Sequence, residues 1–149
     1  TRGTGVMNRT FHSYGVFKSG ITGRINGALI SMETGAAVAF AIFNLQERGE
    51  MFIGHNTEVY KGMICGEHSR DNDLEVNFLK GKKLTNMRTQ GTDENVVLTP
   101  PRQMSLEEKM AYINDDEVLE VTPKNLRLRK KYLDPHERKR MAKSSSQNV

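Results

Sequence analysis

The chain has 149 residues, a formal net charge of +4 at pH 7 and 36% hydrophobic residues, which is enough for one domain with a sizeable core. The single cysteine, Cys65, excludes an intrachain disulfide framework and is typical of a reducing compartment. The longest apolar stretch, residues 36–43, is far shorter than the roughly 20 residues that a membrane span needs, so we expect no membrane contact. Because there is no initiator methionine, we expect a fragment of a longer protein.

Charged residues gather in patches of one sign. Residues 105–120 hold six acidic groups and one lysine, whereas residues 124–143 carry nine Lys or Arg and two acidic groups. Mutual repulsion within the basic segment would be relieved by a polyanion, which favours nucleic acid as its partner. The acidic segment is typical of a solvated helix face.

Hydrophobic periodicity predicts mainly strands in the first half of the chain. Alternation predicts a strand over residues 3–13, and residues 18–23 resemble a linker. Residues 26–31 and 36–43 are expected to pair as strands, although the alanines of the second stretch leave a helix open. Glycines bound two further short apolar runs, which predicts short strands at 51–54 and 62–66.

Residues 71–91 keep neither a strand nor a helix period, so we expect a long excursion from the domain body. A strand is predicted at 95–98, before two prolines. Ser105, with Glu108 three residues later, forms a capping box that predicts a helix start. The predicted apolar face of this helix consists of Leu106, Met110 and Ile113.

Two more strands are predicted at 118–121 and 126–129, with Pro123 in the turn between them. Asp134-Pro135 is typical of a helix start and predicts a last helix through Lys143. Together the elements favour an α+β fold, a mostly antiparallel, barrel-like domain with a few short helices and a long basic loop.

No catalytic motif is found in the sequence. A phosphate-binding P-loop is absent, and the four histidines are never spaced for metal ligation with Cys65 or with one another. Cys65 and His68 would point to opposite faces of a strand, which argues against a nucleophile and base pair. We therefore expect no enzyme activity, no metal and no cofactor in this chain.

The best candidate site is a basic, polar segment that could contact RNA phosphates and sugars. An ordinary surface loop explains the same spacing equally well. The candidate residues are Arg70, Lys80, Lys82, Lys83, Thr85, Asn86 and Arg88. A second basic surface is predicted from Lys124, Arg127, Arg129, Lys130, Lys131, Arg138, Lys139 and Arg140.

The same segment carries a family resemblance. Residues 66–74 (GEHSRDNDL), 81–88 (GKKLTNMR) and 91–94 (GTDE) resemble the carboxyl-terminal domain of the BipA/TypA translational GTPases. Residues 44–49 and 115–124 support the resemblance, which covers nearly the whole chain.

The resemblance implies a division of the chain. Residues 1–14 would be the last strand of a truncated ferredoxin-like domain V, and 15–24 a linker. Residues 25–143 would be the family-specific carboxyl-terminal domain, and 144–149 a disordered tail. GTP and Mg would belong to the parent protein, in a GTPase domain outside this chain. An unpaired first strand also invites a non-physiological dimer.

The resemblance further implies a cytoplasmic, ribosome-associated protein with roles in ribosome assembly and stress adaptation. Its carboxyl-terminal domain would contact the acceptor arm of A-site tRNA and 23S rRNA in the 70S ribosome, near the peptidyl-transferase centre. The contacting loop matches residues 70–88. The alternative is a protein-interaction module that docks a basic ribosomal protein through an acidic helix at 107–120.

Overall fold

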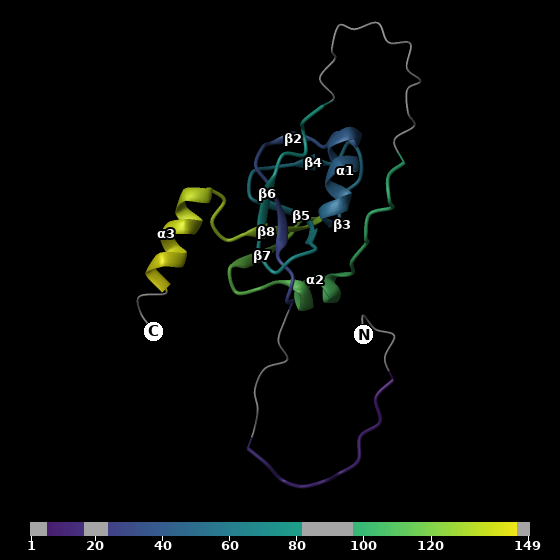
Figure 1. Ribbon diagram of the computed structural model, residues 1–149, viewed down its shortest axis with the longest axis vertical. Coiled ribbons are helices and arrows are strands. Elements are labelled where there is room, and N and C mark those ends of the chain that lie inside the picture. The colour runs from purple at the N-terminus through teal and green to yellow at the C-terminus, as the bar shows by residue number, and fades with distance from the viewer. Residues whose placement is uncertain (1–5, 17–23, 82–96, 146–149) are drawn as a thin grey trace, which may run out of the picture.

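The computed structural model describes residues 6–16, 24–81 and 97–145, and the last two segments build the fold (Figure 1). The strands are β1 (Ala28–Ser31), β2 (Gly35–Ala36), β3 (Gly49–Met51), β4 (Glu58–Val59), β5 (Met63–His68), β6 (Leu74–Val76), β7 (Glu117–Val121) and β8 (Leu126–Lys130). The helices are α1 (Ala39–Leu45), the 3-10 turn η1 (Gln46–Arg48), α2 (Leu106–Tyr112) and α3 (Pro135–Ser145). The predicted α+β class is confirmed, and the sheet of the described residues is open rather than closed into a barrel.

Strand β5 is the centre of the main sheet, whose order is β6-β1-β5-β8-β7. One edge of β5 pairs with β1, while the other edge pairs first with β8 and then with β3. All these pairings are antiparallel except that of β1 with β6, which is parallel. Strands β2 and β4 form a separate small ladder.

The predicted pairing of residues 26–31 with 36–43 is wrong. Strand β1 pairs with β5 and β6 instead, and the second stretch holds the end of β2 followed by α1. The helix that its alanines left open is therefore the form observed. Strand β3 ends at Met51, earlier than predicted, because its ladder with β5 ends there. Val97 and Leu98 lie outside any strand.

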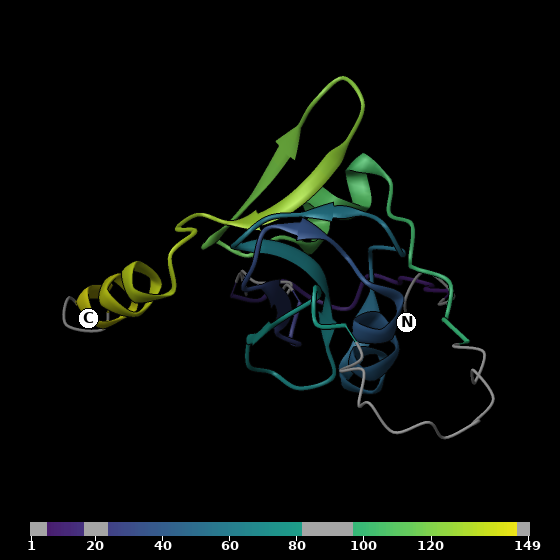
Figure 2. The same ribbon diagram turned by 90° about the horizontal axis from the view of Figure 1, so that it is seen from above.

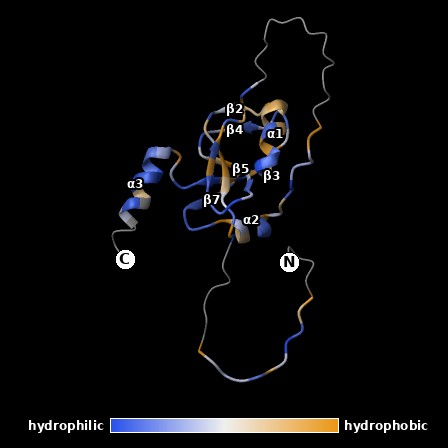
Figure 3. Ribbon diagram, in the orientation of Figure 1, coloured by the Kyte–Doolittle hydropathy of each residue, from blue (hydrophilic) through white to orange (hydrophobic). Residues whose placement is uncertain are grey.

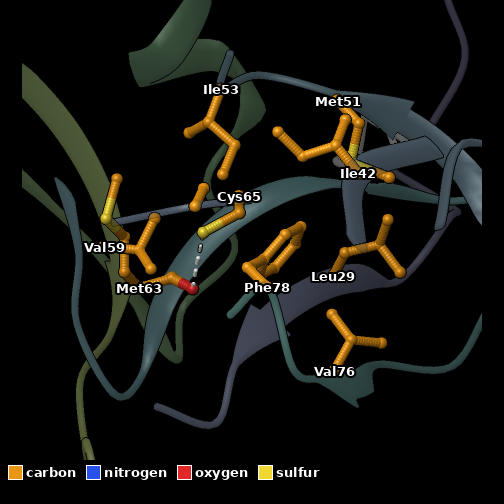
Figure 4. Packing of buried hydrophobic residues seen from close by; sticks show 10 residues of the cluster. Leu29, Ile42, Met51, Ile53, Val59, Met63, Cys65, Val76 and Phe78 are labelled. Atoms are coloured by element: carbon orange, nitrogen blue, oxygen red, sulfur yellow. Dashed lines mark hydrogen bonds between the residues drawn. The ribbon is translucent and has the colours of Figure 1, made fainter. Parts of the chain in front are cut away.

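Two hydrophobic clusters cover opposite faces of the main sheet. Alternation along β1 places Leu29 in the first cluster and its neighbours Ala28 and Ile30 in the second. Because both faces are covered, all four residues of β1 are buried. Figure 4 shows part of the first cluster, with labelled side chains Leu29, Ile42, Met51, Ile53, Val59, Met63, Cys65, Val76 and Phe78.

The first residues of the predicted excursion at 71–91 belong to the domain body. Strand β6 pairs with β1, and the following Phe78 is fully buried in the first cluster. The backbone N–H of Val38 donates to the carbonyl of Phe78 at 2.9 Å. Strand β6 could not be predicted from hydrophobic periodicity, because it is only three residues long. Residues 82–91 of the predicted excursion lie outside the described residues.

Residues 6–16 carry no strand, contrary to the prediction for 3–13 as far as it falls on described residues. Their apolar side chains are exposed, with Val6 at 94% and Tyr14 at 96%. A strand needs a hydrogen-bonded neighbour, and this segment lies apart from the sheet (Figure 1). The expected pairing between copies through this segment stays a prediction.

Helix α2 begins as predicted but faces the body differently. The Ser105 side chain accepts from the Glu108 N–H at 3.2 Å, and Glu108 Oε2 accepts from the Ser105 N–H at 2.7 Å. The predicted apolar face is mostly exposed, with Met110 at 61%. Tyr112 is buried instead, its ring edge-to-face with Phe52 at a centroid distance of 5.3 Å. Burial of the Tyr112 ring, rather than of Leu106 and Met110, therefore sets the orientation of this short helix.

The predicted hairpin of β7 and β8 and the last helix α3 are confirmed. Figure 2 shows α3, in yellow, standing beside the body, and Figure 3 shows that its surface is mainly hydrophilic. Its first turn contacts the body through Arg138 and Glu75, 2.5 Å apart, and through Lys61 and Asp134, 3.0 Å apart. Polar contacts, rather than an apolar face, hold this helix.

A buried lysine joins distant parts of the fold. Lys130 at the end of β8 is only 2% exposed, and its Nζ lies 2.6 Å from Asp73, 2.8 Å from Asp116 and 2.9 Å from Glu117. The ammonium group has three donors, one for each carboxylate. Burial would lower the pKa of Lys130, but the three carboxylates outweigh it and raise this pKa above its ordinary value.

Arg24 adds a second cation to this group, which we call the Lys130 network: Lys130, Arg24, Asp73, Asp116 and Glu117. The guanidinium of Arg24 donates twice to Glu117, at 3.0 and 2.6 Å, and lies 4.4 Å from the ring centroid of Tyr112. Such bidentate pairs and ring contacts are specific in geometry. The network therefore ties β7, β8, α2 and the turn before β6 to the segment that enters β1.

We predict that Lys130→Ala lowers the free energy of unfolding by about 3 kcal/mol, because it removes one of the two cations that contact the fully buried carboxylate of Glu117 and also unpairs the more exposed Asp73 and Asp116. Urea or thermal denaturation followed by circular dichroism measures the change. The matched control is Lys131→Ala, since Lys131 is the exposed neighbour and should change stability by no more than about 0.5 kcal/mol. Equal effects of the two substitutions would show that the network contributes no stability.

The ionisation of Asp73 should make the stability of the fold depend on pH in the acidic range. Burial would raise the pKa of Asp73, but hydrogen bonds from Lys130 and the Ala28 amide outweigh it and lower the pKa below the ordinary 3.8. Ionised Asp73 therefore stabilises the fold above about pH 3.8, and this contribution is lost as the pH falls through the lowered folded value. The melting temperatures of the parent and of Asp73→Asn should converge on acidification. A constant difference, like that of the exposed control Asp115→Asn, would contradict this assignment.

The capping box of α2 should also be measurable. Ser105→Ala removes the acceptor for the Glu108 N–H and should lower the free energy of unfolding by about 1 kcal/mol. Urea denaturation of this variant can be compared with that of Ser13→Ala, which changes an exposed serine outside any element. If both substitutions had the same effect, the cap would not stabilise the domain.

Candidate nucleic-acid interface

Two members of the predicted RNA-binding loop lie within the described residues. Arg70 is in the turn between β5 and β6, and Lys80 follows β6 shortly before residues 82–96. Both side chains are exposed, and neither has a carboxylate partner within the part of the chain that the structure describes. The other predicted members lie outside the described residues: Lys82, Lys83, Thr85, Asn86 and Arg88.

The turn that carries Arg70 is fixed by backbone contacts. The N–H of Gly27 donates to the Arg70 carbonyl at 2.7 Å, and the N–H of His68 donates to the Gly27 carbonyl at 2.8 Å. His68 Nδ1 lies 2.6 Å from the carbonyl oxygen of Asn72, which can only accept, so Nδ1 carries the hydrogen. A Cβ on Gly27 would lie 2.1 Å from that same oxygen, so only glycine permits this approach.

Asp73 connects this turn to the interior. Its Oδ1 accepts from the Ala28 N–H at 2.8 Å, and its Oδ2 meets buried Lys130 at 2.6 Å. The exposed Arg70 therefore lies on the same turn as Asp73, which belongs to the Lys130 network. These contacts fix the backbone from which the Arg70 side chain extends.

Sequence reasoning missed Arg48, which the pairing of β3 with β5 brings beside the same turn. The N–H of Ser69 donates to the Arg48 carbonyl at 2.8 Å. Gly49 permits this contact, because a Cβ there would lie 1.9 Å from the Glu67 carbonyl oxygen. The Arg48 side chain is exposed and has no carboxylate partner among the described residues. No spacing rule links Arg48 to Arg70, since they lie on different elements.

The predicted second basic surface is only partly available. Lys130 does not belong to it, because the inward position on β8 buries its side chain among carboxylates. Arg127 and Arg129 lie 3.3 and 4.0 Å from Glu120, and Arg138 is paired with Glu75. The exposed members are Lys124, Lys131, Lys139 and Arg140.

The acidic segment at 107–120 is not one helix face. Helix α2 ends at Tyr112, and Asp116 and Glu117 belong to the Lys130 network. Glu120 accepts from the Tyr60 hydroxyl at 2.7 Å, and this bond, together with Arg127, holds the pKa of Glu120 below its ordinary value. With Glu108 of the capping box, four of the six carboxylates of this segment already serve contacts within the domain.

The described residues show no arrangement for catalysis or metal binding. Cys65 is fully buried, and burial raises the pKa of its thiol. His68 is held by the Asn72 carbonyl rather than by Cys65. Within the described segments, no group of three or more His, Cys, Asp or Glu side chains is placed to hold a metal ion. None of the helices described is long and apolar enough to span a membrane.

Comparison with known proteins identifies the family. Residues 26–135 match the family model described as the TypA/BipA C-terminal domain. Over 141 residues, the chain is 57% identical to the large ribosomal subunit assembly factor BipA of Buchnera aphidicola (subsp. Schizaphis graminum). It is 55% identical to the proteins of the same name from Salmonella typhimurium (strain LT2) and Escherichia coli (strain K12).

Each of these matches covers 94% of this chain but 23% of the relative. The chain thus spans about a quarter of the length of the curated relatives it matches. The family model covers most of the chain, and over half of the aligned residues are identical in these relatives. On these grounds the chain belongs to the TypA/BipA family and carries the C-terminal domain of that family.

Proposed function

We propose that this chain binds RNA on the ribosome, contacting the acceptor arm of A-site tRNA and 23S rRNA of the 70S ribosome. The named relatives are large ribosomal subunit assembly factors, which makes ribosomal RNA the natural partner. The proposed location is the cytoplasm, in association with ribosomes. GTP hydrolysis by the full-length protein is assigned to a domain outside this chain, whose own role is binding.

The observation that carries the proposal is the contrast between free and paired cations. Arg70 and Lys80, which flank the segment containing residues 82–96, are exposed and without carboxylate partners among the described residues. Lys130 and Arg138, in contrast, are neutralised by nearby carboxylates. Unpaired cations keep their field for an external anion, and RNA phosphates are the anions that a ribosome presents most densely.

The proposed RNA contact includes the predicted members outside the described residues: Lys82, Lys83, Thr85, Asn86 and Arg88. The exposed members of the second basic surface, Lys124, Lys131, Lys139 and Arg140, form an auxiliary contact. Docking of a basic protein through the acidic segment is less favoured. Asp116, Glu117 and Glu120 would have to leave the partners that they have within the domain.

We predict that Lys82→Ala with Lys83→Ala weakens ribosome co-sedimentation and flattens its salt dependence. Each lost phosphate contact should reduce the slope of log affinity against log salt by roughly 0.7–0.9. Removal of Lys139 and Arg140 from the auxiliary surface should have a smaller effect. The assay uses the 149-residue chain with purified ribosomes across a salt series.

The matched control is Lys61→Ala with Arg102→Ala, which removes the same charge from cations that already contact carboxylates. Its binding should stay close to that of the parent. If the control and the loop variant lost affinity equally, general charge rather than the loop would drive binding. If neither lost affinity, the proposed loop contact would be wrong.

A further inference from the structure

A small hollow lies between the two exposed arginines beside the β5–β6 turn. Its volume is about 180 Å³. It is lined by Glu47 and Arg48 from η1 and by His68, Ser69, Arg70, Asn72 and Leu74 from the turn and its flanking strands. Two arginines thus line one concavity, and Glu47 is the single acidic residue in its lining.

The hollow suits one phosphate group better than a whole small molecule. Ligand pockets for complete small molecules usually measure about 300–1,000 Å³, which exceeds this volume. Arginine binds phosphate in a planar, two-pronged geometry, and the Ser69 hydroxyl adds a further donor in the lining. The backbone of Arg48 and Arg70 is fixed by the contacts of Ser69 and Gly27, so both side chains start from fixed points beside the hollow.

A second hollow of about 540 Å³ shares Arg48 and Leu74 with the first. Its lining includes Phe40 on α1 and Asn77 and Lys80 near β6. Glu75 also lines it but is paired with Arg138 at 2.5 Å. The two hollows are therefore neighbours, and the second offers a partly exposed ring, an amide and a cation to the next unit of a ligand held at the first.

We infer that Arg48 and Arg70 form a seat for a backbone phosphate of RNA, with the adjoining nucleotide lying in the second hollow toward Lys80. This inference rests on the proposed RNA binding and names a contact outside the segment 82–96. Arg48 and Glu47 belong to neither of the predicted basic surfaces. A chain-like ligand would use both neighbouring hollows, which share Arg48 and Leu74, whereas a free phosphate would use the first alone.

The test measures binding of a fluorescein-labelled RNA hairpin with a single-stranded 3′ end by fluorescence anisotropy, using the 149-residue chain. Arg48→Ala with Arg70→Ala should weaken binding about tenfold, because it removes two charged donors from the proposed phosphate contact. The salt slope should fall by about 0.7 for a lost single-strand phosphate. The control Lys61→Ala with Arg102→Ala should bind like the parent.

A substitution that should increase RNA affinity provides an independent test of the seat. Glu47→Gln removes the carboxylate from the lining without changing its size, and should strengthen RNA binding about two- to threefold. Because Glu47 is exposed, this substitution should leave folding intact. Unchanged or weaker binding by Glu47→Gln would overturn the seat, as would parent-like binding by the double arginine variant.

Inorganic phosphate distinguishes the possible sources of the anion. In heteronuclear NMR spectra, RNA should shift the amide signals of residues 69–72 and of Asn77, while inorganic phosphate should shift only the first group, and weakly. Tight phosphate binding that RNA does not displace would overturn the RNA assignment. If Lys82→Ala with Lys83→Ala lost RNA while the double arginine variant kept it, the proposed function would stand and this inference would fall. A parent chain that binds no RNA would refute both.

Discussion

The ion pairs around Lys130 are the constraint on which the rest of the domain depends. Glu117 has a fully buried side chain that contacts both Lys130 and Arg24, so one carboxylate holds the hairpin and the segment entering β1. Removing either cation would leave charge in a medium that solvates it poorly. The network therefore fixes where the chain enters the domain, and its member Asp73 extends this constraint to the turn beside it.

The proposed binding surface adjoins that network. Asp73 anchors one end of the turn, Gly27 allows its backbone to approach, and Arg70 is left exposed between them. The β3–β5 pairing places Arg48 on the adjacent turn. The backbone contacts fix where the two side chains begin, so a proposed RNA ligand would have to order the side chains but not the turns that carry them. The β5–β6 turn thus contacts the buried Lys130 through Asp73 and carries the exposed Arg70.

Local signals in the sequence predicted elements whose causes are themselves local. The capping box at Ser105, the Asp134-Pro135 helix start and the hairpin around Pro123 were found because neighbouring residues determine them. The partner of β1 and the existence of β6 were not found. Their hydrogen bonds run to residues far along the chain, and three residues are too few to show a period. The burial of Tyr112 likewise depends on Phe52, which lies on another element.

The sequence by itself determined the α+β class, the family resemblance that the comparisons confirmed, and the supply of cations in each segment. Only the tertiary structure decided which of those cations face outward. Lys130 and Lys131 are adjacent and chemically identical, yet the pleat of β8 buries one among carboxylates and exposes the other. Charge is a property of a residue, whereas its availability to a ligand depends on long-range contacts that no local pattern records.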